Sequence, residues 1–327
     1  MKKTIAIISL CFALTACYEP YVTDYEYSAV SIAYQYDLRT LVVGEGMSFD
    51  FGVMLSGVID NTVDRTVQFE VDNSLVEGAY PIMMGTSSEG SVSQSYVTEA
   101  VRAAGISSLY PVPENLYSIE PSGTMVIKQG RHTATATFKA DSAAMLADAK
   151  VKPSPYYAFA WRVTEADADQ ILEDKSFGVI ALRIENRFFG SWYHGGHTVV
   201  RKDISSEIVS EEWYSGAVPQ PDTRIYTLTS TGPFSVRTNR FANSNGMLNL
   251  AFDGDKITVS SPTKTIEPLG ESSFNGARLL QDRKLFLNYK YSNGDGTTTY
   301  VHDTLSFRNR LRDGVNEWQD PDPEHYK

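Results

Sequence analysis

Two carboxylates beside two aromatic side chains form the stretch of this sequence that best suits ligand recognition. Glu211 and Glu212 directly precede Trp213 and Tyr214. A pyranose sugar has apolar C–H faces that stack on aromatic rings, and hydroxyl groups that carboxylates bind. The passage is loop-like in the sequence, so the alternative is a solvated turn edge without a ligand. We take these four residues as the candidate glycan-binding site.

Two histidines separated by two glycines raise the question of a metal site. The spacing of His194 and His197 suits two imidazoles on one ion, but no third ligand of obvious type is near. The intervening glycines favour a flexible loop instead. Asp253–Asp255 and Asp295–Gly296 have oxygen spacings like those of calcium sites, but they are shorter than an EF-hand loop and suit hairpin turns. The sequence therefore predicts no bound metal.

No recognisable catalytic set is present in the sequence. Glycoside hydrolysis needs two carboxylates flanking one bond, and none of the 40 acidic residues lies in a recognisable strand-end motif. A Gly-x-Ser-x-Gly elbow and a glycine-rich phosphate loop are also missing. The two cysteines, Cys11 and Cys17, both lie near the N-terminus, which excludes a thiolate site in the body of the protein. We expect a protein that is not an enzyme and that needs no cofactor.

Two tryptophans are expected to have structural roles. Residues 157–161 alternate as in a strand, which places Trp161 on a core face. Gly190–Trp192 resembles the Gly-x-Trp opening of lipocalin barrels. That resemblance implies a buried Trp192 whose ring is covered by Arg308 or Arg310 of the last strand.

Two-residue alternation dominates the first half of the chain and predicts half-buried antiparallel strands. The alternating runs are Phe49–Leu55, Val67–Val71, Met125–Lys128, Thr133–Phe138 and Val179–Ile184. Gly57–Asp64 and Gln129–Arg131 look like turns that pair the first two and the next two of these runs. Short helices are expected at 95–104, at 142–149 after Asp141, and at 165–172 after Thr164. This half, residues 28–186, is expected to be a β-sandwich with decorated loops.

The second half, residues 187–327, shows strands without a strong helix. The expected strands are Ile225–Thr229, Ser235–Thr238, Met247–Phe252, Lys256–Val259, Leu285–Tyr291 and Thr297–Asp303. Turns at 253–255 and 293–296 make two of these connections hairpins. Strands alone over this length predict a closed or nearly closed antiparallel barrel or sandwich, with a frayed tail.

The N-terminus has the order of residues found in a secretory signal. Lys2 and Lys3 precede a short apolar run from Ile5 to Leu14. Leu14–Cys17 resembles the bacterial lipobox, which implies cleavage after residue 16 and lipidation of Cys17. Residues 17–27 are acidic and aperiodic, and we expect them to form a tether. An ordinary signal peptide with an incidental cysteine is the alternative.

The charge of the chain excludes some partners. The formal net charge of −11 at pH 7 becomes −13 once Lys2 and Lys3 leave with the signal. A body this acidic gains nothing from counterion release, so no nucleic acid partner is expected. Anionic headgroups would repel it, so acyl chains alone should hold it at the membrane.

Several short strings resemble a domain of unknown function that occurs in Bacteroidetes lipoproteins, sometimes ahead of chitinase-like glycosidases. They are Tyr36–Val42, Asp60–Asn61, Asp64–Val67, Leu116–Ile119 and Thr124–Gly130. Val301–Trp318 resembles the closing motif of the usual partner domain. The resemblance implies an immunoglobulin-like sandwich, a lipocalin-like barrel and a surface lipoprotein of a glycan-utilisation locus beside a SusC/SusD-like uptake pair. It implies no catalytic residues and no defined ligand.

The favoured hypothesis is a non-catalytic glycan-binding lipoprotein at the cell surface. Lipid-anchored in the outer membrane, it would capture polysaccharide or oligosaccharide for an uptake complex. The alternative is a structural, assembly or adhesin-like surface lipoprotein without a sugar site. A hydrolase of unrecognised type is the weakest reading.

Overall fold

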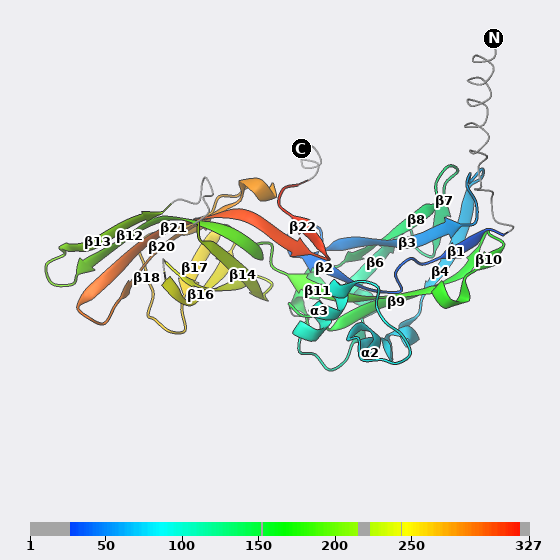
Figure 1. Ribbon diagram of the computed structural model, residues 1–327, viewed down its shortest axis with the longest axis horizontal. Coiled ribbons are helices and arrows are strands. Elements are labelled where there is room, and N and C mark those ends of the chain that lie inside the picture. Colours follow the sequence, from blue (N-terminus) through cyan, green and yellow to red (C-terminus); the bar gives the residue numbers. More distant parts are fainter. Residues whose placement is uncertain (1–26, 152, 215–222, 243, 321–327) are drawn as a thin grey trace, which may run out of the picture.

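The computed structural model describes residues 27–320 except 152, 215–222 and 243. The described chain is mostly β-strand with a few short helices, and it forms two bodies side by side (Figure 1). Strands between Ala29 and Glu185 build two sheets, and strands between Gly190 and Glu317 build a third. The expected all-β, two-domain fold is confirmed. Cys17 lies outside the described residues, so its lipidation stays a prediction.

The first body is a sandwich of two sheets. One sheet has the order β10 (Gln170–Ile171), β1 (Ala29–Ser31), β3 (Ser48–Ser56), β8 (Thr133–Ala140) and β6 (Tyr117–Glu120). The other has the order β2 (Tyr36–Val42), β11 (Phe177–Glu185), β9 (Tyr157–Ala166), β4 (Arg65–Val71) and β7 (Thr124–Ile127), with β5 (Tyr110–Pro111) beside β9. Their facing sides share one apolar core that includes Phe51, Phe138 and Trp161. The expected core position of Trp161 is confirmed.

Two connections of the sandwich differ from the expected hairpins. β3 pairs with β1 and β8, whereas β4 pairs with β7 and β9 in the opposite sheet. Gly57–Asp64 therefore crosses between the sheets, and Gln129–Arg131 crosses back from β7 to β8. Alternation reveals which side of a strand is buried, but it does not reveal which sheet the strand joins.

Short helices cover the outside of the second sheet (Figure 1). α2 (Ala79–Met83) and α3 (Ser95–Ala103) form a second core with small residues of β9 and β11 such as Ala160 and Ala181. α4 (Ser142–Ala147) begins as expected after Asp141, whose carboxylate accepts a 2.9 Å hydrogen bond from the Ala144 N–H. Single 3-10 turns occupy 73–76, 114–116, 173–175 and 280–282.

The helix expected at 165–172 is wrong. Glu165 and Ala166 continue β9 and pair with Gln68 and Val67 of β4. Gln170–Ile171 then forms β10 beside β1. Tertiary strand pairing outweighs the local capping signal of Thr164 because short helices have little stability of their own.

The second body is an antiparallel barrel. Its ring runs through β12 (Gly190–Lys202), β14 (Ile225–Gly232), β15 (Ser235–Phe241), β16 (Ser244–Asp253), β17 (Lys256–Ser260), β19 (Ser272–Phe274), β20 (Lys284–Ser292) and β21 (Thr297–Arg312). β21 pairs back to β12 and closes the ring. The expected hairpins β16–β17 and β20–β21 are confirmed. β13 (Ile208–Tyr214), β18 (Glu267–Pro268) and β22 (Val315–Glu317) are attached to β12, β20 and β21.

The barrel is filled by large apolar side chains rather than by an open channel. Trp192, Tyr226 and Tyr289 are fully buried in one cluster with leucines and phenylalanines of the surrounding strands. No helix among the described residues is long and apolar enough to span a membrane.

Candidate functional site

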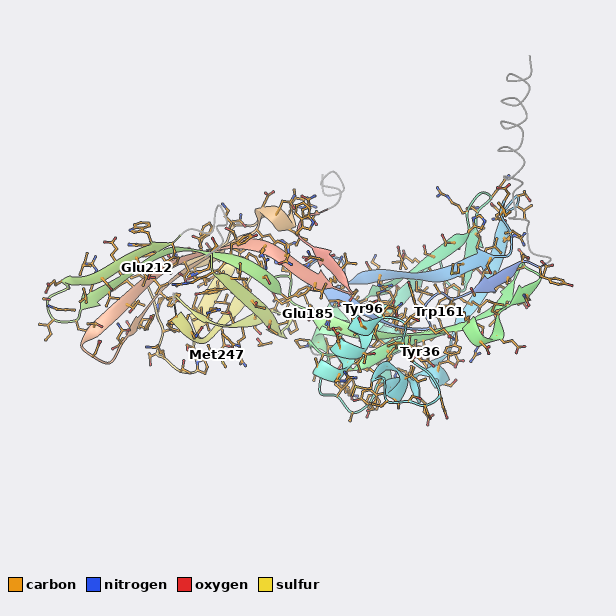
Figure 2. The ribbon with its side chains drawn as sticks, in the orientation of Figure 1. Tyr36, Tyr96, Trp161, Glu185, Glu212 and Met247 are labelled. Atoms are coloured by element: carbon orange, nitrogen blue, oxygen red, sulfur yellow. The ribbon has the colours of Figure 1, made fainter. Side chains whose placement is uncertain are left out.

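The candidate site lies on a strand and not in a loop. β13 pairs with the second half of β12, with Trp213 opposite His197 and Tyr214 opposite Gly196. Almost every side chain of β13 is exposed on both faces. The strand therefore lacks the alternating apolar pattern by which half-buried strands are recognised. Figure 2 labels Glu212 on this strand, along the side of the barrel and away from Glu185 at the domain junction.

Strand geometry divides the four predicted residues between two faces. Successive side chains of a strand point to opposite sides, so Glu211 and Trp213 share one face and Glu212 and Tyr214 the other. We call the first side the outer face, because it carries His197, and the second the inner face, because it continues into the barrel core. The four residues are therefore not one site.

On the outer face, Trp213 begins a row of side chains that crosses four strands. Its indole stacks on the imidazole of His197, with centroids 3.8 Å apart and planes at 17°. His197 pairs with His302 of β21, whose ring lies 6.5 Å away and nearly parallel. His302 pairs in turn with Asn288 of β20 through a 2.7 Å contact between Nδ1 and Oδ1.

Glu211 fixes the orientation of the tryptophan. Its Oε1 lies 2.7 Å from Nε2 of His197 and accepts a 3.2 Å hydrogen bond from Nε1 of Trp213. Trp213 is nevertheless 74% exposed. Because His197 covers one face of the indole and β13 is the edge strand, the other face is open to solvent. A preoriented aromatic face with a carboxylate at its rim can stack on a sugar ring.

Glu212 lies on the opposite side of the edge strand. Its carboxylate is 3.7 Å from the guanidinium of Arg224. It therefore cannot act on a ligand bound at Trp213 together with Glu211.

The two histidines of the glycine-separated pair do not share a ligand. Both lie on β12, and the loop expected there is wrong. His194 is buried on the inner face, whereas His197 lies on the outer face. Across the described part of the chain, no group of three His, Cys, Asp or Glu side chains is placed to hold a metal ion.

Gly196 serves close packing of strands rather than flexibility. Its φ is +136°, and a Cβ at this position would lie 2.2 Å from the carbonyl oxygen of His302. Only glycine therefore fits between β12 and β21 at this point.

The inner face holds a buried polar cluster around Asp303. The Asp303 carboxylate is fully buried and accepts hydrogen bonds from the hydroxyls of Tyr214 at 2.7 Å and Tyr289 at 3.3 Å. Nε2 of His194 lies 2.9 Å from the same carboxylate, and the imidazole stacks on Tyr226 at 4.3 Å. A buried carboxylate needs partners of this kind, so Tyr214 serves the core.

The tyrosines of this cluster hold their protons tightly. Burial, and then the charge of Asp303, raises the pKa of Tyr214, Tyr226 and Tyr289 above the ordinary value. Sequence reasoning missed the cluster. Its signal was Asp303 itself, which occupies an inward position of the run 301–305 between two apolar residues.

Trp192 has the expected structural role but not the expected partner. It is fully buried, packs edge-on against Phe307 at 5.4 Å, and donates a 3.0 Å hydrogen bond to the Phe188 carbonyl. Arg310 lies over Phe189 and Arg308 over Tyr193. The tryptophan is covered by rings, and the predicted arginine cover is wrong.

Comparison with known proteins gives one family match and several similar structures. A family model described only as an N-terminal domain matches residues 18–170, which is less than half of the chain. No curated protein matches the sequence.

A Bacteroides ovatus protein of unknown function has the same architecture, with a TM-score of 0.60, 15% identity, and coverage of 91% of this chain and 99% of that one. A second Bacteroides ovatus protein of unknown function gives a TM-score of 0.42 and 11% identity, covering 92% and 99%. A proposed carbohydrate-binding protein from Bacteroides ovatus gives 0.32 and 13%, covering 90% and 72%. The last two TM-scores are too low to support any inference. The first shows that this two-domain all-β fold also occurs in a Bacteroides ovatus protein whose own function is unknown.

Proposed function

We propose that this protein is a non-catalytic glycan-binding lipoprotein of the cell surface. The observation that carries the proposal is the open indole face of Trp213, held by His197 and Glu211 at the edge of a sheet. The indole is 74% exposed and stands beside a carboxylate, which gives a sugar both an aromatic face to stack on and a group to accept its hydroxyls.

The placement of the carboxylates supports binding without catalysis. Glu211 and Glu212 point to opposite faces of β13, so they cannot flank one glycosidic bond. Glu211 also contacts both His197 and Trp213, which suits a positioning role.

The lipid anchor and the partners belong to the same proposal. The lipobox-like Leu14–Cys17 supports attachment of the N-terminus to the outer membrane. A SusC/SusD-like uptake pair would receive the captured oligosaccharide.

Affinity electrophoresis tests the proposal. The full chain with Cys17→Ala, which blocks lipidation, is run through gels containing one soluble polysaccharide each. We expect retardation in at least one gel, and at least about tenfold weaker binding for Trp213→Ala, because the stacking surface is lost.

Trp318→Ala is the matched control, since Trp318 is also exposed, at 58%, but follows β22, which pairs with Arg310–Arg312 of β21 and not with the part of β21 that carries His302. It should bind like the parent. Unchanged retardation in Trp213→Ala, or no retardation of a natively folded parent in any gel, would refute glycan binding at Trp213. The second outcome would favour an assembly or adhesin-like role.

A further inference from the structure

The barrel wall has a gap beside β17. β17 pairs with β16 along its whole length, from Lys256 to Ser260. On its other side it pairs with β19 only at Lys256 and Ile257. β18 approaches from the other side of the gap, but it pairs with β20. Among the described residues, the edge from Thr258 to Ser260 therefore has no neighbouring strand, and its backbone groups are free to bind a ligand or water.

A pocket of about 640 Å³ fills this gap. We call it the wall slot, and its lining residues are Lys256–Val259, Ile266, Pro268, Gly270–Ser272, Asn288 and Tyr289. Thr258 is exposed, whereas Ile257 and Tyr289 are buried in the core. The slot therefore extends from the surface of the barrel wall toward its core. Its volume lies within the range of small-molecule sites, roughly 300–1,000 Å³.

The lining combines an apolar wall with polar groups at the rim. Val259 and Ile266, which are only partly buried, supply the apolar side together with the exposed Pro268. Lys256 and Glu271 stand exposed at the rim, and neither side chain makes a hydrogen bond or ion pair with the described residues. One cation, one anion and an unpaired strand edge supply both donors and acceptors without a net charge.

We propose that the wall slot is a second binding site of this protein, for one neutral sugar unit. A pyranose has an apolar C–H face for the Val259 and Ile266 side, and hydroxyls for Lys256, Glu271 and the free edge of β17. An anionic sugar would gain at Lys256 and lose at Glu271. An extended peptide fits less well, because the free edge is three residues long and Pro268 across the slot has no N–H to donate.

This inference rests on the proposed function for the class of ligand, but not for the position of the site. Trp213 lies on β13, and the wall slot lies between β17 and β18. Asn288 lines the slot and also contacts His302 at the end of the outer row. Trp213 and Thr258 lie on separate strands, so each can be replaced without changing the other.

Isothermal titration of the full chain with Cys17→Ala tests the wall slot. Glucose, galactose, mannose and N-acetylglucosamine are titrated separately, with glucuronic acid as the charged comparison. We expect at least one neutral sugar to bind and glucuronic acid to gain no affinity over glucose, because Lys256 attracts its carboxylate while Glu271 repels it. Thr258→Trp should fill the slot and weaken the neutral sugar at least about tenfold. Thr227→Trp, at an exposed threonine of β14 outside the slot, is the matched control and should bind normally.

A second variant keeps the test decisive if Thr258→Trp does not fold. Glu271→Ala removes an exposed carboxylate and should weaken binding of the neutral sugar about fivefold, as expected for one hydrogen bond.

The wall slot would be overturned if none of the neutral sugars binds the parent. It would also be overturned if Thr258→Trp and Glu271→Ala both bind the sugar with the same affinity as the parent. Loss of monosaccharide binding in Trp213→Ala would also overturn it, while supporting the role of Trp213. Retardation in polysaccharide gels without monosaccharide binding would leave glycan binding at Trp213 intact and refute the slot.

Discussion

Trp213 and Tyr214 are adjacent in the sequence, yet their side chains point in opposite directions. Trp213 faces solvent, and Tyr214 faces a buried polar cluster. The Tyr214 hydroxyl donates to the Asp303 carboxylate at 2.7 Å and lies 2.6 Å from the Thr198 hydroxyl. The Trp213 indole contacts only groups at the surface of the sheet, and most of its area is exposed. Substitutions at these two positions should therefore affect different properties of the protein.

Tyr214→Phe should lower the free energy of unfolding by about 1–2 kcal/mol, because the buried Asp303 loses one donor. Trp213→Ala should change it by less than about 0.5 kcal/mol, since the side chain is exposed. Urea unfolding followed by circular dichroism measures both values. Conversely, Trp213→Ala should lose polysaccharide retardation while Tyr214→Phe keeps it. Equal stability changes in the two variants would contradict the division of the strand into two faces.

The candidate site was predictable in part from residue types. Trp213 and Glu211 were identified because an aromatic ring beside a carboxylate has a recognisable chemistry. The sequence could not separate Tyr214 from them, because apolar and polar residues do not alternate along β13, so no pattern assigns its side chains to two faces. His302 and Asn288 were missed because they join the row only through pairing with strands about a hundred residues from β12.

At the scale of elements, the seam between β12 and β21 holds both the outer row and the inner cluster in place. Twelve residues of β12, from Ser191 to Lys202, have partners on β21. His197 and His302 face outward from this seam, while His194 and Asp303 face inward. Changes in the seam should therefore disturb both faces together.

Gly196→Ala should disrupt this seam. The added Cβ would meet the His302 carbonyl at 2.2 Å, and φ near +136° is unfavourable for alanine. We expect a loss of at least about 2 kcal/mol in the free energy of unfolding, together with weaker polysaccharide retardation. Gly105→Ala is a useful comparison, because φ there is also positive, at +62°, but the site is open. A Gly196→Ala variant as stable as Gly105→Ala would show that the strands can separate locally at no cost.

Elements with strong local signals were predictable, and elements defined by distant partners were not. The hairpins β16–β17 and β20–β21 follow from turn residues between two alternating runs. β10 and the crossing of Gly57–Asp64 depend on which sheet is available for pairing. The sequence near Thr164 contains no information on that partner, so a local capping signal was misleading.

At the scale of the whole molecule, a network of buried charges joins the two domains. Glu45, from the turn after β2, accepts hydrogen bonds from Arg310 at 2.6 Å and from Arg283 at 2.8 Å. Asp313, in the turn between β21 and β22, accepts hydrogen bonds from the backbone and hydroxyl of Thr40. The chain passes from β11 to β12 without a long linker, and these contacts hold the barrel against the sandwich.

A second carboxylate at this junction, Glu185, has a pKa shifted in the opposite direction to that of Glu45. Glu185 lies at the end of β11, between the domains (Figure 2). It accepts a hydrogen bond from the Ser230 hydroxyl and lies 3.5 Å from Arg183. Burial dominates and raises its pKa, although Arg183 and Ser230 oppose this. At Glu45 burial also acts to raise the pKa, but Arg310 and Arg283 together outweigh it and the pKa is lowered.

These opposite shifts predict opposite pH dependences for two matched variants. The lowered pKa of Glu45 gives stability that is present above its ordinary value of 4.5 and is lost as the pH falls below it. The raised pKa of Glu185 gives stability that is present below 4.5 and is lost as the pH rises through the folded-state pKa. Glu45→Gln should therefore cost about 3 kcal/mol at neutral pH, with a deficit that shrinks below pH 4.5.

Glu185→Gln should instead gain stability relative to the parent as the pH rises above 4.5, because the amide carries no buried charge. Urea unfolding of the parent and both variants across a pH series on either side of 4.5 measures the two differences. Ser230→Ala removes the hydroxyl that donates to Glu185 and should raise the Glu185 pKa further. The pH range over which Glu185 titrates in the folded protein should therefore extend to higher pH. Parallel pH profiles for Glu45→Gln and Glu185→Gln would refute the assignment, because two carboxylates with pKa values shifted in opposite directions cannot titrate over the same range.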